Sequence, residues 1–310
     1  MHNVKKLSQE KRAQKRLADV ERARKYNALS RAAMARRSER IYDEESLVAC
    51  EQVLSINPEM NTLWNFRREI LAAMYPDGRD DARRKPCERE FRLTQECLGL
   101  NPKSYPVWHH RQWVMQWGGC TWQHPVDLKL TAKLLMMDER NFHCWTYRRF
   151  VAMVAKVPAE AELKLTSDKV NANFSNYSAW HYRSKLLPRR YSGESADELG
   201  PKLLEELQFV RNAFFCSPED QSAWFYHRWL LAQLAQHSSA AAAPEAVLLD
   251  ELGAVEELLE LEPECKWPLL TAALLATALG RGGEATARFE ACRRVDPFRA
   301  AYYDHSMARA

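Results

Sequence analysis

The stretch that decides the fold is YPVWHHR at residues 105–111, an aromatic residue followed by Trp-x-x-Arg. Further copies are TLWNFRR at 62–68, FHCWTYRR at 142–149, YSAWHYR at 177–183 and QSAWFYHR at 221–228, where the arginine comes one place late. We predict a sixth unit at Trp267, which lacks the arginine, and a degenerate seventh around Tyr302 and Tyr303. The tryptophans lie 35 to 44 residues apart. Self-similarity at such a period is typical of repeat proteins. A tetratricopeptide scaffold would instead show a regular period of about 34 residues and a different signature.

Most copies of the motif are preceded by residues that end one helix and begin another. Because proline has no N–H and disfavours a helical residue before it, it marks the end of a helix. Proline dipeptides of this kind are Asn57-Pro58, Asn101-Pro102, Ser217-Pro218, Glu262-Pro263 and Asp296-Pro297. Apolar residues at helical spacing lie upstream, as in Leu47, Cys50, Val53 and Leu54. Each repeat is therefore predicted to be a helix, a short turn and a second helix that opens on the motif.

Short turns place the two helices of each repeat antiparallel, and such hairpins stack into a solenoid. We predict an all-α, right-handed superhelical solenoid of antiparallel helical hairpins. It forms one domain over 41–310 with about six to seven hairpins, after a basic helical arm over 1–40. The proline-bounded stretches 76–86, 118–125, 188–201 and 238–244 are predicted to be surface loops.

The repeated tryptophan and arginine share one face of the second helix, being three residues apart. We interpret them as packing residues, with the indole filling the layer between hairpins and the guanidinium clamping a carbonyl. The residues with this structural role are Trp64, Arg67, Trp108, Arg111, Trp145, Arg148, Trp180, Arg183, Trp224 and Arg228.

The composition narrows the class of protein. Glycine is scarce, at 10 residues of 310, which favours helices over sheets. No run of about 18 apolar residues occurs, so stable membrane insertion is not expected. The start shows no secretory signal pattern, and the eight cysteines are scattered without a C-x-x-C. We therefore expect reduced thiols and a cytoplasmic protein.

Charge is concentrated in the first 40 residues. They hold 13 Lys or Arg and 4 Asp or Glu, so they carry +9, while the whole chain carries +4. A basic helix can bind nucleic acid, anionic lipid or a phosphorylated ligand, or it can simply be a solvated arm. We favour the solvated arm and expect no nucleic-acid partner.

No self-contained catalytic motif is present, neither a phosphate loop, a nucleophile elbow nor a cysteine and histidine cluster with zinc spacing. One polar convergence stands out in the second and third repeats, where Lys103 and Tyr105 open one helix and Phe142 and His143 open the next. Equivalent positions of adjacent repeats are neighbours in a solenoid. A cation, a phenol and an imidazole at helix N-termini suit a phosphate group, although ordinary turn residues would show the same pattern.

The stretches NPKSYPVWHHR at 101–111 and RNFHCW at 140–145 resemble the repeats of protein prenyltransferase α subunits. The resemblance runs over nearly the whole chain. It implies a crescent of hairpins wrapped around a β subunit, which binds the catalytic zinc and the isoprenoid. The chain would then be inactive alone and active as an obligate heterodimer.

Within this family the chain resembles the α subunit of the Rab enzyme, geranylgeranyltransferase type II, in its short fungal form. Pro106 stands where the α subunit shared by farnesyltransferase and the type I enzyme has a glutamine, and Phe142 stands where that subunit has a tyrosine. The resemblance implies transfer of geranylgeranyl from geranylgeranyl diphosphate to C-terminal cysteines of Rab GTPases presented by a Rab escort protein. The shared α subunit and a non-enzymatic helical scaffold are the alternatives.

The resemblance also implies roles for individual residues. Lys103 and His143 are the expected catalytic residues, and Lys103, Tyr105, Phe142 and His143 the expected rim around the diphosphate. His2 matches an N-terminal histidine that reaches the zinc of the β subunit in the resting state.

Overall fold

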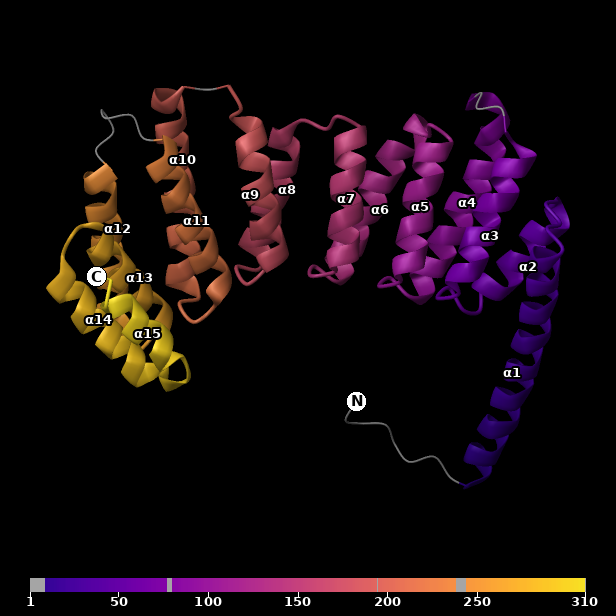
Figure 1. Ribbon diagram of the computed structural model, residues 1–310, viewed down its shortest axis with the longest axis horizontal. Helices are drawn as coiled ribbons and strands as arrows, with labels where there is room; N and C mark the ends of the chain where they lie inside the picture. Colours follow the sequence, from indigo (N-terminus) through magenta and orange to yellow (C-terminus); the bar gives the residue numbers. More distant parts are fainter. Residues whose placement is uncertain (1–8, 77–79, 194, 238–243, 310) are drawn as a thin grey trace. The chain divides into compact units, whose positions relative to one another are not determined.

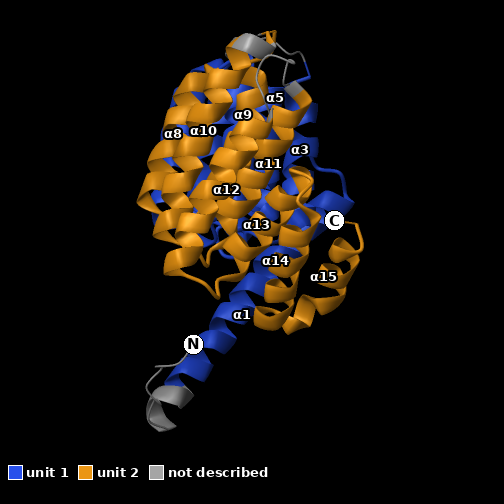
Figure 2. Ribbon diagram, turned by 90° about the vertical axis from the view of Figure 1, so that its left-hand side faces the viewer, with its two compact units in different colours: residues 1–156 blue, residues 157–310 orange. Residues whose placement is uncertain are grey.

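The computed structural model describes residues 9–76, 80–193, 195–237 and 244–309, and within them every regular element is a helix. The chain divides into two compact units, residues 1–156 and 157–310 (Figure 2). The division into an arm over 1–40 and one domain over 41–310 stays a prediction.

The first unit begins with a long helix followed by three hairpins (Figure 1). Its helices are α1 (Gln9–Ser38), α2 (Glu44–Leu54), α3 (Asn61–Met74), α4 (Asp80–Leu100), α5 (Tyr105–Trp117), α6 (His124–Met137) and α7 (Phe142–Val154), with a 3-10 turn η1 (Thr121–Gln123) before α6. Helix α2 packs on α3, α4 on α5 and α6 on α7, while α3, α5 and α7 pack in succession. The turns within the three hairpins lie along one edge of this unit (Figure 1).

The second unit repeats the same plan. Its helices are α8 (Ala159–Ala172), α9 (Tyr177–Arg190), α10 (Ala196–Cys216), α11 (Gln221–His237), α12 (Pro244–Leu261), α13 (Lys266–Ala278), α14 (Gly282–Val295) and α15 (Ala300–Met307), with a 3-10 turn η2 (Pro297–Arg299) before α15. The second helices α9, α11 and α13 again pack in succession. The predicted all-α solenoid of antiparallel hairpins is thereby confirmed within each unit.

Side-chain oxygens shape the turns that join the helices of a hairpin. Asn57, Asn101 and Asp138 each accept the backbone N–H two residues later, at 3.1, 3.1 and 3.2 Å. This local bond gives the backbone an alternative to the helix, so the first helix ends there. Asn141 then caps α7 by accepting from the N–H groups of His143 and Cys144.

Two of the predicted surface loops are largely helical. Pro86 lies inside α4, and Pro188 and Pro201 lie inside α9 and α10. The prediction was wrong because a proline removes a single N–H from a helix, and α4 and α10 still pack along α5 and α11. A capping box between Ser195 and Glu198 starts α10 ahead of its proline.

The basic helix α1 is exposed from residue 14 to residue 25 and packs on the first hairpin through its C-terminal half. Arg36 forms an ion pair with Asp43 at 2.7 Å and donates to the Ser46 hydroxyl at 2.7 Å. Asn57 donates to the hydroxyl of Tyr26 at 2.9 Å. These contacts attach the arm to α2 and to the turn that follows it.

Candidate functional site

The repeated tryptophans share one hydrogen bond that determines where each second helix lies. Each indole N–H donates to the carbonyl oxygen six residues earlier, in the preceding turn, at 2.8 to 2.9 Å. The pairs are Trp64 with Pro58, Trp108 with Pro102, Trp145 with Glu139, Trp180 with Phe174 and Trp224 with Pro218. Because the ring is buried while its N–H is paired, the tryptophan holds the turn against its own helix.

The repeated arginines connect the two helices of a hairpin. Each donates from Nη1 to a carbonyl oxygen 20 residues upstream, in the first helix. The pairs are Arg67 with Leu47, Arg111 with Phe91, Arg148 with Leu128 and Arg183 with Leu163, at 2.6 to 3.1 Å. The guanidinium group has further donors, which are used toward the neighbouring hairpin.

Buried carboxylates receive those remaining donors. Arg67 Nε donates to Glu90 at 2.8 Å, and His110 Nε2 lies 2.8 Å from the same carboxylate. Asp127 accepts from Arg111 at 3.0 Å and also from the hydroxyl of Tyr147. Each carboxylate lies on the first helix of a hairpin, and its partners lie on the second helices of that hairpin and of the one before.

The second unit shows the same arrangement. Glu206 accepts from Arg183 at 2.7 Å and from the Tyr226 hydroxyl at 2.8 Å. Sequence reasoning missed all three carboxylates. The available signal was a single acidic residue on the buried face of a first helix, 16 to 23 residues after the arginine. We call these groups the carboxylate clamps.

The fifth repeat differs from the prediction. His227, not Arg228, occupies the arginine position three residues after the tryptophan, and its Nε2 lies 2.8 Å from Glu251. Arg211 binds the same carboxylate at 2.7 Å. Arg228 is one position further around the helix, so its guanidinium points away from the clamp and lies 6.0 Å from the centre of the Phe225 ring.

The sixth repeat also departs from its predicted register. Leu269, six residues after Pro263, takes the buried place of the tryptophan and is 4% exposed. Trp267 lies two positions earlier and is half-buried. Trp267 therefore occupies the position that His143 has in the third repeat, and Lys266 that of Phe142. Tyr303 lies six residues after Pro297 and takes the tryptophan position in the seventh hairpin.

Lowering the pH should weaken the carboxylate clamp at Glu90. Burial alone would raise the pKa of Glu90, but the Arg67 charge and the hydrogen bonds from His110 and Arg67 lower it from 4.5 to about 2. Since the folded pKa is depressed, the stabilisation is complete above pH 4.5 and is lost as the pH falls toward 2. The difference corresponds to about 3 kcal/mol. Urea unfolding between pH 6 and pH 3 should therefore show a steeper loss of stability in the wild type than in Glu90→Gln.

The exposed Glu96 on the same helix is the control for that experiment, since Glu96→Gln should leave the pH slope of the wild type unchanged. Equal slopes for wild type and Glu90→Gln would contradict the ionised state of this clamp.

The candidate functional site lies at the N-terminal ends of α5 and α7, in the first unit. Lys103 lies in the turn before α5, and its Nζ is 3.0 Å from a carboxylate oxygen of Asp138, in the turn before α7. The lysine side chain is 64% exposed. Its hydrogen bond lowers the pKa of Asp138, so the carboxyl is ionised at neutral pH. Asp138 orients the ammonium group, and sequence reasoning missed it because the two residues lie 35 positions apart.

Three rings border this ion pair. The ring of His143 meets that of Tyr105 edge-on at 4.1 Å, and the ring of Phe142 lies 3.9 Å from that of His143. Tyr105 and Phe142 are 67% and 54% exposed, whereas His143 is buried. Burial lowers the pKa of His143 by more than the Glu59 charge raises it, and the nearby Lys103 charge lowers it further. The imidazole is therefore neutral at pH 7, so it can accept a hydrogen bond at one nitrogen and donate at the other.

The structure brings together the four residues expected from the sequence, Lys103, Tyr105, Phe142 and His143. The lysine has three donors and uses one toward Asp138, so two remain for a ligand. The N-terminal ends of two helices add positive potential at the same edge. This arrangement can bind an anion such as a phosphate group. His2 lies outside the described residues.

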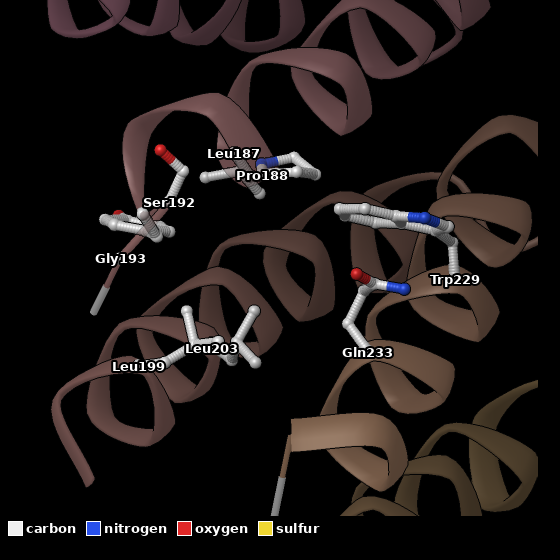
Figure 3. Close-up of a pocket in the computed structure, with 9 residues that line it drawn as sticks. Leu187, Pro188, Ser192, Gly193, Leu199, Leu203, Trp229 and Gln233 are labelled. Carbon is white, nitrogen blue, oxygen red and sulfur yellow. The ribbon is translucent and has the colours of Figure 1, made fainter. Parts of the chain in front are cut away.

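Outside this edge, the described ranges offer neither a metal site nor a membrane-spanning helix, but they do contain a cavity. No group of three or more His, Cys, Asp or Glu residues within them could hold a metal ion. No helix among them is both long enough and apolar enough to cross a membrane. Figure 3 shows a cavity of about 200 Å³ in the second unit, between the end of α9, the start of α10, and α11. Its walls are mainly apolar, with Leu187, Leu199, Leu203 and the ring of Trp229 around it.

A known family shares this repeat. The pattern described as "Protein prenyltransferase alpha subunit repeat" matches residues 43–74, 87–118, 126–153, 159–190 and 203–234, and each match covers one hairpin or most of one. The chain belongs to the protein prenyltransferase α-subunit repeat family. The fifth match ends within α11, before the two hairpins in which the tryptophan position holds leucine or tyrosine.

Members of the family with curated names are similar over most of this chain. "Geranylgeranyl transferase type-2 subunit alpha" of Homo sapiens is 43% identical over 233 residues, which are 74% of this chain and 41% of that protein. The protein of that name from Dictyostelium discoideum is 40% identical over 90% of both chains. The one from Saccharomyces cerevisiae is 33% identical over 74% of this chain and 72% of its own. The chain thus spans about two fifths of the length of the mammalian relatives that it matches.

A solved structure has the same fold. The structure titled "Candida albicans protein geranylgeranyltransferase-I complexed with GGPP" superimposes with a TM-score of 0.74 over 92% of this chain and 90% of that one. At 20% sequence identity, this likeness concerns the fold alone.

Proposed function

We propose that this chain is the cytoplasmic α subunit of a type-2 geranylgeranyltransferase. The enzyme would transfer the geranylgeranyl group of geranylgeranyl diphosphate to C-terminal cysteines of Rab GTPases, which a Rab escort protein presents. The observation that carries the proposal is the ammonium group of Lys103, held by Asp138 between the N-terminal ends of α5 and α7. The names of the relatives from Homo sapiens, Dictyostelium discoideum and Saccharomyces cerevisiae agree with it.

The role of this edge follows from the charge that develops during prenyl transfer. As the bond between the isoprenoid carbon and oxygen breaks, negative charge grows on the departing diphosphate. Lys103 would stabilise that charge with its two remaining donors, and such contacts act most strongly where charge develops. The neutral imidazole of His143 and the hydroxyl of Tyr105 would donate further hydrogen bonds at the rim.

The rest of the chemistry is proposed to lie on the β subunit. A zinc ion bound there would keep the attacking cysteine thiol deprotonated at neutral pH. This chain would contribute the diphosphate edge and the surface on which the β subunit assembles. His2 is proposed to approach that zinc in the resting state.

Two residues favour the type-2 enzyme over the α subunit shared by farnesyltransferase and the type I enzyme. Pro106 is buried in the first turn of α5 and has neither a side-chain amide nor an N–H with which to bind a substrate carboxylate. Phe142 is exposed at the rim and lacks a phenolic hydroxyl. The edge is therefore suited to the diphosphate and poorly suited to reading a tetrapeptide tail, which agrees with substrates delivered by an escort protein.

The proposal predicts that activity requires the β subunit. The full chain alone should transfer no geranylgeranyl group, whereas the chain co-purified with its β subunit should prenylate a Rab substrate when escort protein is added. Incorporation of radiolabelled isoprenoid measures both. Transfer by the chain alone would contradict the subunit role.

The substrate class is tested with the same heterodimer. A Rab with escort protein should be modified, and a peptide ending in a CaaX sequence should not. Modification of the CaaX peptide without the escort protein would favour the shared α subunit instead.

A further inference from the structure

A further cavity in the second unit lies at repeat positions equivalent to those of the edge around Lys103. It has a volume of about 320 Å³ and lies at the N-terminal ends of α11 and α13, against η2 and α15. Its walls include Gln221, Lys266 and Trp267. These residues occupy the repeat positions that Tyr105, Phe142 and His143 have in the second and third repeats. Equivalent positions at the N-terminal ends of the second helices therefore carry charged and aromatic side chains in both units.

Two cations of this cavity, Arg228 and Lys266, form no salt bridge in the described part of the chain, although the Lys266 charge helps to lower the pKa of Asp296. Arg228 takes no part in the contacts to Glu251. Its recorded contact is with the face of the Phe225 ring, whose centre lies 6.0 Å from the guanidinium carbon. Lys266 lies 5.1 Å from the centre of the Trp267 ring. In contrast, the third cation of the cavity, Arg299, forms an ion pair with Asp296 at 2.7 Å. Half-buried cations that form no salt bridge attract an anionic group, and an arginine can bind a phosphate through two parallel hydrogen bonds.

Aromatic rings flank these cations. Trp267 meets Phe225 edge-on at 5.5 Å, and Tyr302, 44% exposed, lines the same cavity. The five tryptophans of the repeat use their indole N–H on a carbonyl, but within the described residues no such bond is recorded for Trp267. Its N–H is thus available to a ligand. A base that stacks on the ring would take the place of the Lys266 side chain over it, and such stacking stabilises a bound base by about 1–3 kcal/mol.

The cavity also contains a hydrogen-bond acceptor. Asp296 accepts from Arg299 and from the Tyr303 hydroxyl through the same oxygen, Oδ2, at 2.7 and 3.0 Å. No side-chain hydrogen bond to Oδ1 is recorded among the described residues, so this oxygen can accept from an amine or a hydroxyl of a ligand. A group that combines an anion, a planar ring and such a donor is a nucleoside phosphate.

We propose that this cavity, lined by Arg228, Lys266, Trp267, Tyr302 and Asp296, binds a nucleoside diphosphate. The diphosphate lies between Arg228 and Lys266, the base stacks on Trp267 and Tyr302, and Asp296 accepts from the base or the ribose. The volume is within the range of cavities that hold small ligands. The site is separate from the edge around Lys103 and makes no use of the isoprenoid chemistry.

Isothermal titration of the full chain, co-purified with its β subunit, tests the site with ADP as the probe. We expect saturable binding of one ADP with a dissociation constant below about 1 mM. Arg228→Gln should weaken it about tenfold, which is the loss of one strong charge-assisted contact. Adenosine and inorganic diphosphate should each bind at least about tenfold more weakly than ADP, since each lacks half of the contacts.

The controls separate this site from the diphosphate edge. Arg149→Gln changes the arginine at the same repeat position in α7, where it contacts Thr146, and should leave ADP binding unchanged. Lys103→Ala should also leave it unchanged. Trp267→Leu should weaken binding as Arg228→Gln does. If Trp267→Leu fails to co-purify, Arg228→Gln decides, because that side chain makes no ion pair in the described structure.

Three results would overturn the proposal. They are the absence of saturable ADP binding, an equal loss in Arg149→Gln and Arg228→Gln, and a loss confined to Lys103→Ala. The last would place the nucleotide at the diphosphate edge.

Discussion

Replacing Asp127 by alanine is expected to lower the free energy of unfolding by about 3–5 kcal/mol. Asp127 is fully buried and accepts from Arg111, from the Tyr147 hydroxyl and from Gln123 at 2.8 Å. Removing the carboxylate leaves the Arg111 charge buried without its counter-ion and leaves the phenol without an acceptor. The cost of those orphaned groups exceeds the packing that the small side chain provides.

Urea unfolding of the full chain, followed by circular dichroism, measures the effect. Asp127→Asn retains an acceptor but loses the charge, so it should fall between the wild type and the alanine variant. Glu96→Ala, which removes an exposed carboxylate from α4, should change stability by less than about 0.5 kcal/mol. A loss for Asp127→Ala no larger than that of Glu96→Ala would mean that the clamp contributes nothing to stability.

Replacing Lys103 by alanine is expected to slow the chemical step of prenyl transfer on the order of 10²-fold. The ammonium group lies at the edge where two helices begin, and it is proposed to meet the charge that develops on the leaving diphosphate. The side chain is 64% exposed, and its recorded ion pair is with Asp138, so its removal should leave the hairpins intact. The effect should therefore appear in the rate and not in the yield of heterodimer.

Single-turnover transfer from geranylgeranyl diphosphate to a Rab with escort protein measures that rate. Lys133→Ala, which removes an exposed lysine from α6, is the matched control and should behave like the wild type. Co-purification with the β subunit should be the same for all three chains. An unchanged single-turnover rate in Lys103→Ala would count against the diphosphate role.

Much of the fold could be predicted because its signals are local. A tryptophan six residues after a proline or its equivalent, and an arginine three residues later, are close enough in sequence to be read as one motif. The helices and turns that they organise were therefore predicted correctly. The proximity of Tyr105, Phe142 and His143 also agrees with the sequence, because equivalent positions of adjacent repeats are neighbours, while the role of this edge stays a prediction.

The partners of these residues could not be predicted in the same way. Glu90, Asp127 and Glu206 lie 16 to 23 residues beyond the arginines they bind, on helices that carry other acidic residues as well. Which acidic residue faces inward depends on the packing of three helices. Asp138 likewise reaches Lys103 across two turns that adjoin only when the hairpins stack.

The sequence by itself determined the repeat and the class of fold, because each depends on residues within one turn or at equivalent positions of successive repeats. Only the tertiary structure decided the register of the late repeats. There Leu269 replaces the tryptophan, and His227 replaces the arginine. The physical reason is burial, because the pattern YPVWHHR can be recognised in the sequence wherever its residues fill the layer between hairpins. Where other residues fill that layer, Trp267 and Arg228 are left at the surface, and their position follows from the packing of α11, α13 and α15.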